Sequence, residues 1–546
     1  MGKINGKVIF IVVWLLVIGL LVYSRFTNLG WGLPYPMHPD ERNMANAIQN
    51  LNCKISNFLP IESGSKQITN FKQLISNCLN PHFFAYGQLP LYLGYVIVFL
   101  LKFFDGDLGT SIGFQEAAIS LRLVSAVASI LNVFVLIKIV DLISNIKNKK
   151  ILIILIATFS PFFIQFSHFG TTESLLMLFY SLIVYLSMRL LESRTTDAVV
   201  WLGLVSGLAV ATKVSSIVFI VVPLISILSS LRSWDRYKNL IKFGTLTIIF
   251  MILFSPHNLI NFHDFFSSIK YESDVATGKA LVFYTRQFFN TVPVWFQLTK
   301  IFPYALGWPV FILGTLGFLG LLWKDKKINL LRFSFLVYFL PNAFLFAKWA
   351  RFMAPVFPLM VMFAVLFLLK IKAINIIKII IVIIAILPGI AYLSVYKKPD
   401  VRFQASEWIY KNIPNGSFLL FETANVVDIP IMDQRIKIKD QKVFEKNYQT
   451  VSFNFYDLDE SLRLQSELKD HLEKANYIFV PSRRIFANHP KQKYPILNQY
   501  YSDLFSEKLG FKKVAEFSAG LNDENSEETW TVFDHPVIRI YKKTSL

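Results

Sequence analysis

Eleven apolar runs, most of them close to the length of a bilayer-spanning helix, follow one another through the first 396 residues. About 20 apolar residues in an α-helix cross the hydrocarbon core of a membrane, where unpaired backbone groups find no water. The chain is therefore predicted to be mainly α, a polytopic membrane protein of about 11 transmembrane helices. The predicted spans are residues 8–22, 117–140, 151–167, 174–191, 199–212, 214–231, 243–258, 304–323, 331–347, 352–369 and 373–395.

Charge separates the chain into two regions. Only 48 of the first 396 residues are charged, against 43 of the last 150, a share close to the roughly 25% of a soluble domain. We expect a membrane domain, 1–396, and a small extracytoplasmic α/β domain, 397–546. The expected strands of the second domain are 417–422, 477–481, 514–517 and 537–541, and its expected helices are 402–412 and 460–474.

The short apolar segment 88–104 decides the topology of everything after it. Cytoplasmic loops of membrane proteins are rich in Lys and Arg. If this segment lies along the membrane surface, 19 of the 33 Lys and Arg of residues 1–396 fall in short inside ends, with Lys147, Lys149 and Lys150 in one tight turn. If it crosses, these clusters face outward. We therefore expect an inside N-terminus, an uncleaved first helix and an outside C-terminal domain.

This topology places three large segments outside a cell membrane, at about 27–116, about 259–303 and 397–546. No inside loop is long enough for a domain, so we expect any chemistry on the outer face, where ATP and nucleotide sugars are not available. Neither a phosphate loop nor a dinucleotide fingerprint occurs in the sequence. The net charge of +19 arises almost entirely before residue 397, so it indicates membrane topology rather than nucleic-acid binding.

The two cysteines of the chain, Cys53 and Cys78, both fall in the first outer segment. An oxidising compartment would permit a disulfide between them, whereas in a reducing habitat they would be two unrelated small residues. The eight His are scattered without a spacing typical of zinc sites. We expect no metal and no cofactor.

Acidic residues are rare in the membrane region, and Asp40 and Glu41 stand together just beyond the first predicted helix. Pro39 can start a helix at these carboxylates. Adjacent residues of a helix do not face the same way, so one carboxylate can point into a cleft while the other caps or braces the backbone. The alternative is a solvated helix start rich in acids.

Residues 80–92 combine polar groups, aromatic rings and turn residues at the start of the non-crossing segment, with Tyr86 and Gln88 among them. Rings at headgroup level suit a helix that lies in the membrane interface. With the short helix expected after Glu41, this gives two interfacial helices in the outer loop 27–116. The alternative is aromatic anchoring without chemistry.

Basic residues interrupt or border the apolar runs at Arg122, Lys213, Lys348 and Arg351. A cation at such a depth needs an anionic partner, and the only acids nearby in depth are Glu173 and the carboxylate pair. More cations than acids at one depth favour an anionic ligand, and a phosphate would fit. Snorkelling to lipid headgroups is the alternative.

These features resemble the GT-C superfamily of membrane glycosyltransferases, and within it the protein O-mannosyltransferase and aminoarabinose transferase group (glycosyltransferase family 39-like). The similar motifs keep their order over about residues 8–370. They are Asp40-Glu41, Gly87 to Tyr92, Ser120-Leu121-Arg122, Phe159-Ser160-Pro161 through Ser167-His168 to Glu173, Gly207 to Lys213, and Arg351 with Pro355 and Pro358. Residues 405–416 look like the start of the outer α/β domain of many bacterial relatives.

The resemblance implies a GT-C fold and an enzyme that moves a sugar, hexosyl or pentosyl, from a polyprenyl-phosphate carrier to an acceptor, with inversion. Asp40 would be the general base, and Glu41 would position the acceptor or brace the loop. Lys213, Arg351 and Arg42 would hold the carrier phosphate, which is also the leaving group. The other candidates for substrate binding are Tyr86, Gln88, Arg122, His168, Glu173 and Lys348.

The chain departs from both branches of this group. Asn43 stands where the aminoarabinose branch has Arg, and Leu89 where it has Lys; residues 259–303 are too short for the β-trefoil of the mannosyltransferase branch. Neither the donor sugar nor the acceptor therefore carries over, and a protein hydroxyl, a lipid and an envelope glycan stay open as acceptors. A transporter or lipid flippase is the alternative function, although no internal repeat is found. Eleven helices would be excessive for a membrane-anchored sensor.

Overall fold

The computed structural model describes residues 6–51, 78–107, 111–146, 149–193, 196–230, 233–423, 429–431 and 446–544. Cys78 is buried and disulfide-bonded, whereas its predicted partner, Cys53, lies outside the described residues.

The membrane part is helical, and each predicted span coincides largely with a helix or with two consecutive helices. The helices that contain the spans are α1 (Gly6–Phe26), α5 (Phe114–Ile143), α6 (Lys149–Thr158) with α7 (Pro161–His168), α8 (Glu173–Ser193), α9 (Asp197–Thr212), η3 (Val214–Ile220) with α10 (Val221–Ser230), α11 (Ser233–Phe254), α14 (Phe302–Leu306) with α15 (Trp308–Gly320), α16 (Lys326–Ala343), η6 (Ala350–Val356) with α17 (Phe357–Lys370), and α18 (Asn375–Lys397). The segments between them carry α2 (Pro39–Gln49), α4 (Leu89–Asp105), α12 (His257–Ile260), α13 (Phe262–Thr277), η4 (Phe283–Phe288) and η5 (Gln297–Ile301).

By length and composition, 5 helices of the described chain can cross a membrane, or up to 7 if each of two bent pairs is one span. The α6–α7 pair bends by 57°, and the pair formed by Gln297–Leu306 and Trp308–Gly320 bends by 115°. Pro161 and Pro309 stand in the first turn of the second helix of each pair, where proline is tolerated but cannot continue the preceding helix. The chain is a multi-pass membrane protein, and the number eleven stays a prediction.

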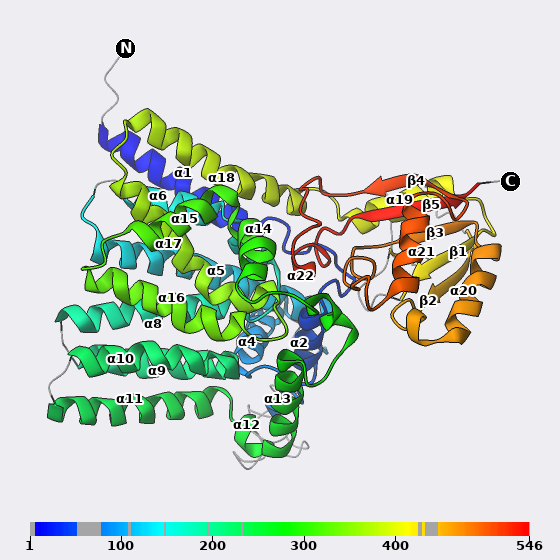
Figure 1. Cartoon of the computed structure of the whole chain (residues 1–546). Coiled ribbons are helices and arrows are strands. Elements are labelled where there is room, and N and C mark those ends of the chain that lie inside the picture. The colour runs from blue at the N-terminus through cyan, green and yellow to red at the C-terminus, as the bar shows by residue number, and fades with distance from the viewer. Residues whose placement is uncertain are drawn as a thin grey trace.

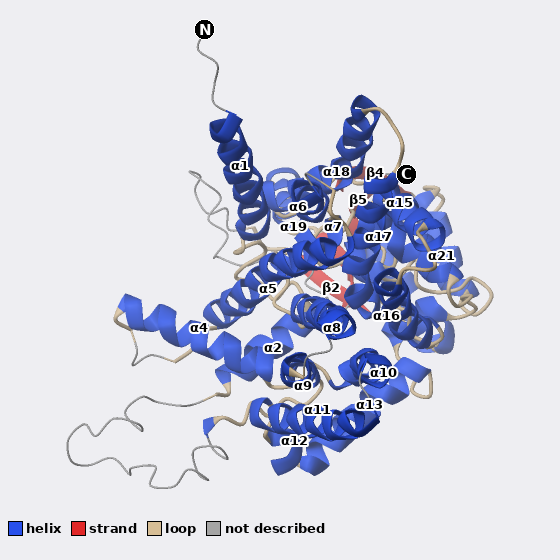
Figure 2. Cartoon of the chain, turned by 90° about the vertical axis from the view of Figure 1, so that its left-hand side faces the viewer, coloured by secondary structure: helices blue, strands red, loops and turns tan. Residues whose placement is uncertain are grey.

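The helix α4 runs across the direction of the long helices. Figure 1 shows α8, α9 and α11 lengthwise and α4 almost end-on, and Figure 2, turned by 90°, shows α4 lengthwise beside the ends of the others. That residues 88–104 lie along the membrane surface stays a prediction.

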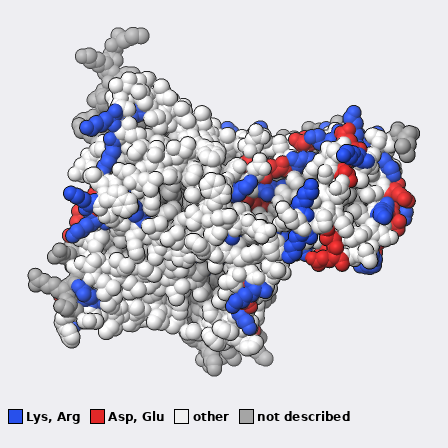
Figure 3. All heavy atoms as spheres, in the orientation of Figure 1, with Lys and Arg blue, Asp and Glu red and all other residues white. Residues whose placement is uncertain are grey.

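Surface charge is distributed unevenly along the direction of the long helices. In Figure 3, Lys and Arg gather at one edge of the helical part and charges of both signs cover the C-terminal domain at the other end, with a broad, largely uncharged belt between them. The start of α1 and the C-terminal domain lie at opposite ends of this belt in Figure 1. Such a belt is the surface that lipid tails would cover.

The C-terminal domain is a five-stranded sheet with the order β2-β1-β3-β5-β4, packed with helices. The strands β2, β1 and β3 are parallel, and β5 and β4 pair antiparallel at the other edge. The predicted strands and helices are present; β2, a half-exposed edge strand, and α21 were not predicted. The elements are α19 (Val401–Asn412), β1 (Phe418–Glu422), β2 (Gln449–Phe453), η7 (Leu458–Glu460), α20 (Leu462–Lys474), β3 (Tyr477–Val480), α21 (Pro495–Phe505), β4 (Phe511–Phe517), α22 (Glu528–Thr531) and β5 (Ile538–Lys543).

The segment around α22 leaves the sheet and packs into the helical part. Trp530, Val532 and Phe533 belong to the same buried apolar cluster as residues of α5, α8 and α17. The side-chain amide of Gln165 in α7 donates a hydrogen bond to the Trp530 carbonyl oxygen at 2.8 Å. Residues of the α22 segment are therefore part of the hydrophobic core of the helical part.

Candidate active site

His38 fixes the start of α2, where the carboxylate pair stands. Its Nδ1 accepts a hydrogen bond from the Asp40 backbone N–H at 3.2 Å. Burial, and then the nearby guanidinium of Arg351, lower the pKa of His38 well below its usual value, so the ring is neutral and its Nδ1 can accept. The ring packs between Phe169 and Phe533, at centroid distances of 4.7 and 4.3 Å. The start of α2 thus packs against Phe169 of the helical part and Phe533 of the C-terminal region.

The two carboxylates point to different surroundings. Glu41 is 1% exposed and forms a two-point ion pair with Arg122: Oε1 lies 2.6 Å from Nη2 and Oε2 lies 2.8 Å from Nε. Glu41 Oε2 also accepts from the Gly170 backbone N–H at 2.7 Å. Arg122 Nη1 donates to the carbonyl oxygens of Leu29 and Trp31. Glu41 and Arg122 thereby tie the first outer loop to α5, away from open space.

Asp40 instead faces a cavity, together with Arg351. The Arg351 Nη1 donates to Asp40 Oδ2 and lies 3.4 Å from the Tyr86 hydroxyl. The Arg351 guanidinium also lies over the Trp349 ring, 4.8 Å from its centroid. Asp40 keeps about a fifth of its side chain exposed, so it stays accessible from the cavity.

The cavity has a volume of about 290 Å³ and lies between α2, the loop before α4, α13, η6 and the C-terminal domain. A space of this size, with few polar groups among aromatic walls, is typical of a small-molecule site. Its lining residues are Pro39, Asp40, Arg42, Asn43, Phe83, Ala85, Tyr86, Tyr271, Glu272, Val275, Tyr284, Trp349, Arg351, Arg484, Glu528, Thr529 and Phe533.

Lys213 lies next to this cavity and shares two aromatic neighbours with Arg351. Its Nζ is 4.9 Å from the Tyr86 ring centroid and 5.5 Å from that of Phe352, and the Arg351 guanidinium is 5.9 Å from the Phe352 centroid. Among the described residues, no carboxylate lies within 4.0 Å of the Lys213 ammonium. Lys213 itself has an extended backbone and separates α9 from η3.

Glu173 begins α8 and is buried, with a hydrogen bond at 3.4 Å from the Thr172 hydroxyl. Burial raises the pKa of the Tyr86 hydroxyl well above its usual value, and the charge of Glu173 adds to that rise. Glu173 therefore lies close enough to Tyr86 to act on it electrostatically, although it does not line the cavity.

Three other predicted binding residues are placed elsewhere. Gln88 joins α4 to α12 through hydrogen bonds to Asn258 and from the His257 backbone N–H. The His168 ring stacks on Tyr396 at 3.7 Å, and its two nitrogens face backbone carbonyl oxygens. The Lys348 ammonium donates to the Phe346 carbonyl oxygen at 3.1 Å. All three support neighbouring chain segments.

The structure adds cavity residues that the sequence did not single out. Arg484 and Glu528 come from the C-terminal domain, and Glu272 comes from α13. They lie in segments that contain several charged residues, so the sequence does not distinguish one Arg or Glu there as a candidate for binding. The unusually close Arg483-Arg484 and Glu527-Glu528 doublets are the only local signal.

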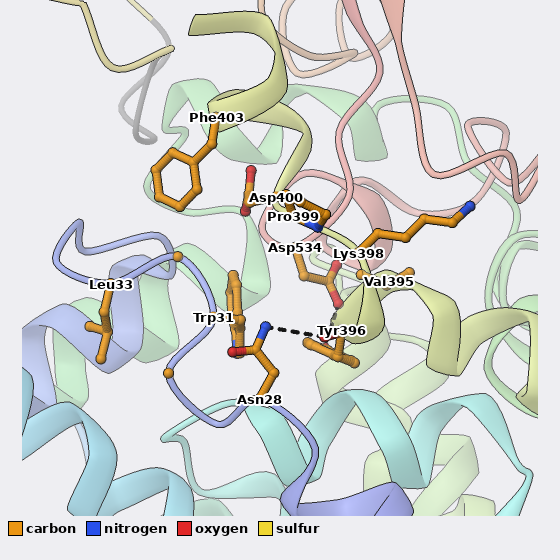
Figure 4. A pocket seen from close by; sticks show the side chains of 12 residues that line it. Asn28, Trp31, Leu33, Val395, Tyr396, Lys398, Pro399, Asp400, Phe403 and Asp534 are labelled. Atoms are coloured by element: carbon orange, nitrogen blue, oxygen red, sulfur yellow. Dashed lines mark hydrogen bonds between the residues drawn. The ribbon is translucent and has the colours of Figure 1, made fainter. Parts of the chain in front are cut away.

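A second, smaller cavity of about 140 Å³ lies where the two domains join (Figure 4). Asn28 donates to the Tyr396 carbonyl oxygen at 3.1 Å, which links the end of α1 to the end of α18. The carboxylates of Asp400 and Asp534 stand on its wall, and both have partners: Arg402 for the first, and Tyr392, Tyr396 and His535 for the second. None of the predicted site residues lines this cavity.

Among the described residues, no group of three or more His, Cys, Asp and Glu could hold a metal ion. The cavity at Asp40 instead combines one carboxylate base candidate with three guanidinium groups. Such a set suits proton abstraction beside an anionic group.

Residues 103–260 match the model of the dolichyl-phosphate-mannose-protein mannosyltransferase family. This range contains Arg122, His168, Glu173 and Lys213, but neither Asp40 nor Arg351. The match confirms the resemblance that the sequence indicates. No curated protein matches the chain.

Three solved structures are similar in fold at low sequence identity. ArnT from Cupriavidus metallidurans in the apo state is 11% identical over 98% of each chain, with a TM-score of 0.45. The same protein bound to undecaprenyl phosphate gives 11%, 98% of each chain and a TM-score of 0.41. The apo oligosaccharyltransferase of Archaeoglobus fulgidus is 11% identical over 90% of this chain and 72% of its own, with a TM-score of 0.47. At this level of similarity they assign no residue roles here.

Proposed function

We propose that the protein is a membrane glycosyltransferase that moves a sugar from a polyprenyl-phosphate carrier to an acceptor on the outer face of the membrane, with inversion. The observation that supports this most is the placement of Asp40 and Arg351 together on the wall of one cavity, beside Lys213. The match of residues 103–260 to a lipid-phosphate-dependent mannosyltransferase family points the same way.

In this proposal Asp40 is the general base. Its carboxylate takes the proton of the acceptor O–H as the oxygen forms a bond to the anomeric carbon of the sugar. The bond from that carbon to the carrier phosphate breaks, and the phosphate leaves with the electron pair. Attack opposite to the leaving group inverts the anomeric centre. A positioned base contributes roughly 10²–10⁴-fold to such a step.

Lys213 and Arg351 are the proposed ligands of the carrier phosphate. Both contact Tyr86 and Phe352, so a phosphate beside these rings would lie within reach of both cations. In the structure, Arg351 donates a hydrogen bond to Asp40. A carboxylate paired with a guanidinium is a weak base, because the positive charge favours its ionised form. The carrier phosphate and Asp40 therefore compete for Arg351, and donor binding frees the base.

Glu41 and Arg122 have a supporting role in this proposal. Their buried pair holds the first outer loop against α5, so Asp40, the preceding residue, keeps a fixed direction. Residues 1–396 would form the GT-C catalytic domain and 397–546 an extracytoplasmic domain that closes the cavity with Arg484, Glu528 and Phe533.

The direct test is mass spectrometry of membrane proteins, lipids and envelope glycans from cells with and without the chain. One class of molecule is expected to carry an added hexose or pentose only when the chain is present. Cells with Asp40→Asn are the matched control and are expected to lack the added mass. If no class differs between the two strains, the transferase proposal fails.

A further inference from the structure

Arg484 is a buried arginine of the C-terminal domain that lines the cavity of Asp40. It stands in the turn after β3 and is 5% exposed. Its nearest carboxylate is that of Glu528, with Oε1 at 3.9 Å from Nη2, beyond hydrogen-bond distance. The guanidinium donates one hydrogen bond to the Tyr456 hydroxyl oxygen. Among the described residues, Arg484 Nε and Nη1 find no acceptor.

Buried donors without acceptors are costly, and a guanidinium carries five N–H groups that need acceptors. The Arg351 Nε on the same cavity also lacks an acceptor among the described residues. An oxygen-rich anion between these side chains would satisfy several donors at once, and guanidinium groups match the geometry of phosphate and carboxylate.

The cavity wall carries charges of both signs. The guanidinium groups of Arg351, Arg122 and Arg484 all add to the effect of burial in lowering the pKa of His38. Arg42, on the same cavity wall, has no ion pair with a described residue. The carboxylates on the wall are Asp40, held by Arg351, with Glu272 on α13 and Glu528. The guanidinium groups and carboxylates of the wall are equal in number, so an anion would be held by the donors of Arg484 and Arg351 that find no acceptor rather than by an excess of positive charge.

Arg351, one of the two proposed carrier ligands, lines the same cavity as Arg484, whereas the other, Lys213, does not. Lys213 contacts the Tyr86 ring but does not line the cavity, whereas Arg484 does. We propose that Arg484 binds an anionic group of the acceptor, a phosphate or a carboxylate, while the acceptor hydroxyl lies at Asp40. The C-terminal domain then selects the acceptor. This inference rests on the proposed transferase function and names the chemical class of its acceptor.

The experiment uses the full-length protein in detergent, saturated with undecaprenyl phosphate so that the carrier site is filled. Inorganic phosphate and acetate are then titrated separately and followed by calorimetry. We expect wild type to bind at least one of them, and Arg484→Gln to bind it about 10-fold more weakly or not at all. Binding of phosphate alone indicates a phosphorylated acceptor, and binding of acetate indicates a carboxylate.

Two variants keep the test independent of folding. Arg463→Gln removes the same charge from an exposed position of the same domain and should leave anion binding unchanged. Glu528→Gln removes the carboxylate nearest Arg484 and should tighten anion binding. Equal binding by Arg484→Gln and wild type, or no anion binding by wild type, overturns the inference. Failure of undecaprenyl phosphate itself to bind would instead count against the transferase function.

Discussion

The Arg351 guanidinium donates to the carboxylate of Asp40, across 311 positions of sequence. The pair joins η6 to the first turn of α2 on the wall of one cavity. It also gives one cation two proposed roles, because Arg351 pairs with the proposed base and is a proposed ligand of the carrier phosphate. Donor binding and base activation are thereby coupled, and linkage requires the coupling to act in both directions.

The substitution Asp40→Asn keeps the shape of the side chain and removes the base. Turnover should fall by roughly 10²–10⁴-fold. Binding of undecaprenyl phosphate should become tighter, by up to about 10-fold, because Arg351 no longer has a competing carboxylate. Isothermal titration of the protein in nanodiscs measures this, and in an Arg351→Ala background the gain should vanish. Unchanged or weaker binding would contradict the competition.

The substitution Lys213→Ala should weaken binding of undecaprenyl phosphate by about 10–100-fold, through loss of a charge-assisted contact. The same titration measures it. Lys270→Ala, an exposed lysine on α13, changes the net charge equally and should bind like wild type. If both variants bind as wild type does, Lys213 is only a snorkelling cation.

The substitution Glu41→Gln should act mainly on stability, since it leaves the buried Arg122 without its carboxylate. Breaking such a pair costs about 3–5 kcal/mol. Thermal unfolding in detergent should show a clear loss, whereas Glu407→Gln, in an exposed pair with Lys411, should stay within about 0.5 kcal/mol of wild type. A stable Glu41→Gln protein without turnover would move Glu41 into the chemistry.

The buried His535 makes stability depend on pH in the alkaline range. Burial alone would lower its pKa, but the carboxylates of Asp534 and Asp523 raise the His535 pKa from 6.5 to about 10. The folded protein therefore holds this proton more tightly than the unfolded chain does. The stabilisation is fully present below pH 6.5 and is lost as the pH rises through about 10. Thermal unfolding between pH 6 and 10.5 measures it, and His535→Gln should flatten the alkaline slope; an equal slope in both would exclude His535 as its source.

The topology of the chain is open to a reporter test. Fusions after Lys150 and Lys327 should report the inside of the cell, because Lys and Arg are retained there, and a fusion after Tyr396 should report the outside. An inside signal after Tyr396 would mean that residues 88–104 cross the membrane, and would remove the proposed outer-face site.

The sequence predicted the start of α2 well, because Pro39 and the adjacent carboxylates are local signals. It left two arrangements open for the carboxylates, one facing a cleft while the other braces the backbone, or a solvated helix start; the positions of Asp40 and Glu41 match the first. It did not predict that Arg122 would be the partner of Glu41. Arg122 was a candidate for substrate binding because of its expected depth in the membrane. Two residues at the same depth need not face each other, so depth could not identify the partner of Arg122.

The cavity wall contributed by the C-terminal domain could not be predicted for a similar reason. Arg484 and the α22 segment line the cavity together, and the α22 segment is held against the helices by contacts such as that of Gln165 with Trp530. Periodicity and composition describe neighbours along the chain. They carry no information on a contact that joins residues 365 positions apart.

Because residues 527–533 pack against the helices, the cavity can be completed only after these residues have been synthesised. These residues follow all of the described membrane helices in the sequence, so the cavity lacks Glu528, Thr529 and Phe533 until they have been synthesised. A chain that stopped before Glu527 would contain all of these helices and still have an open wall next to Asp40. Only chains that extend beyond Phe533 can therefore form the complete cavity.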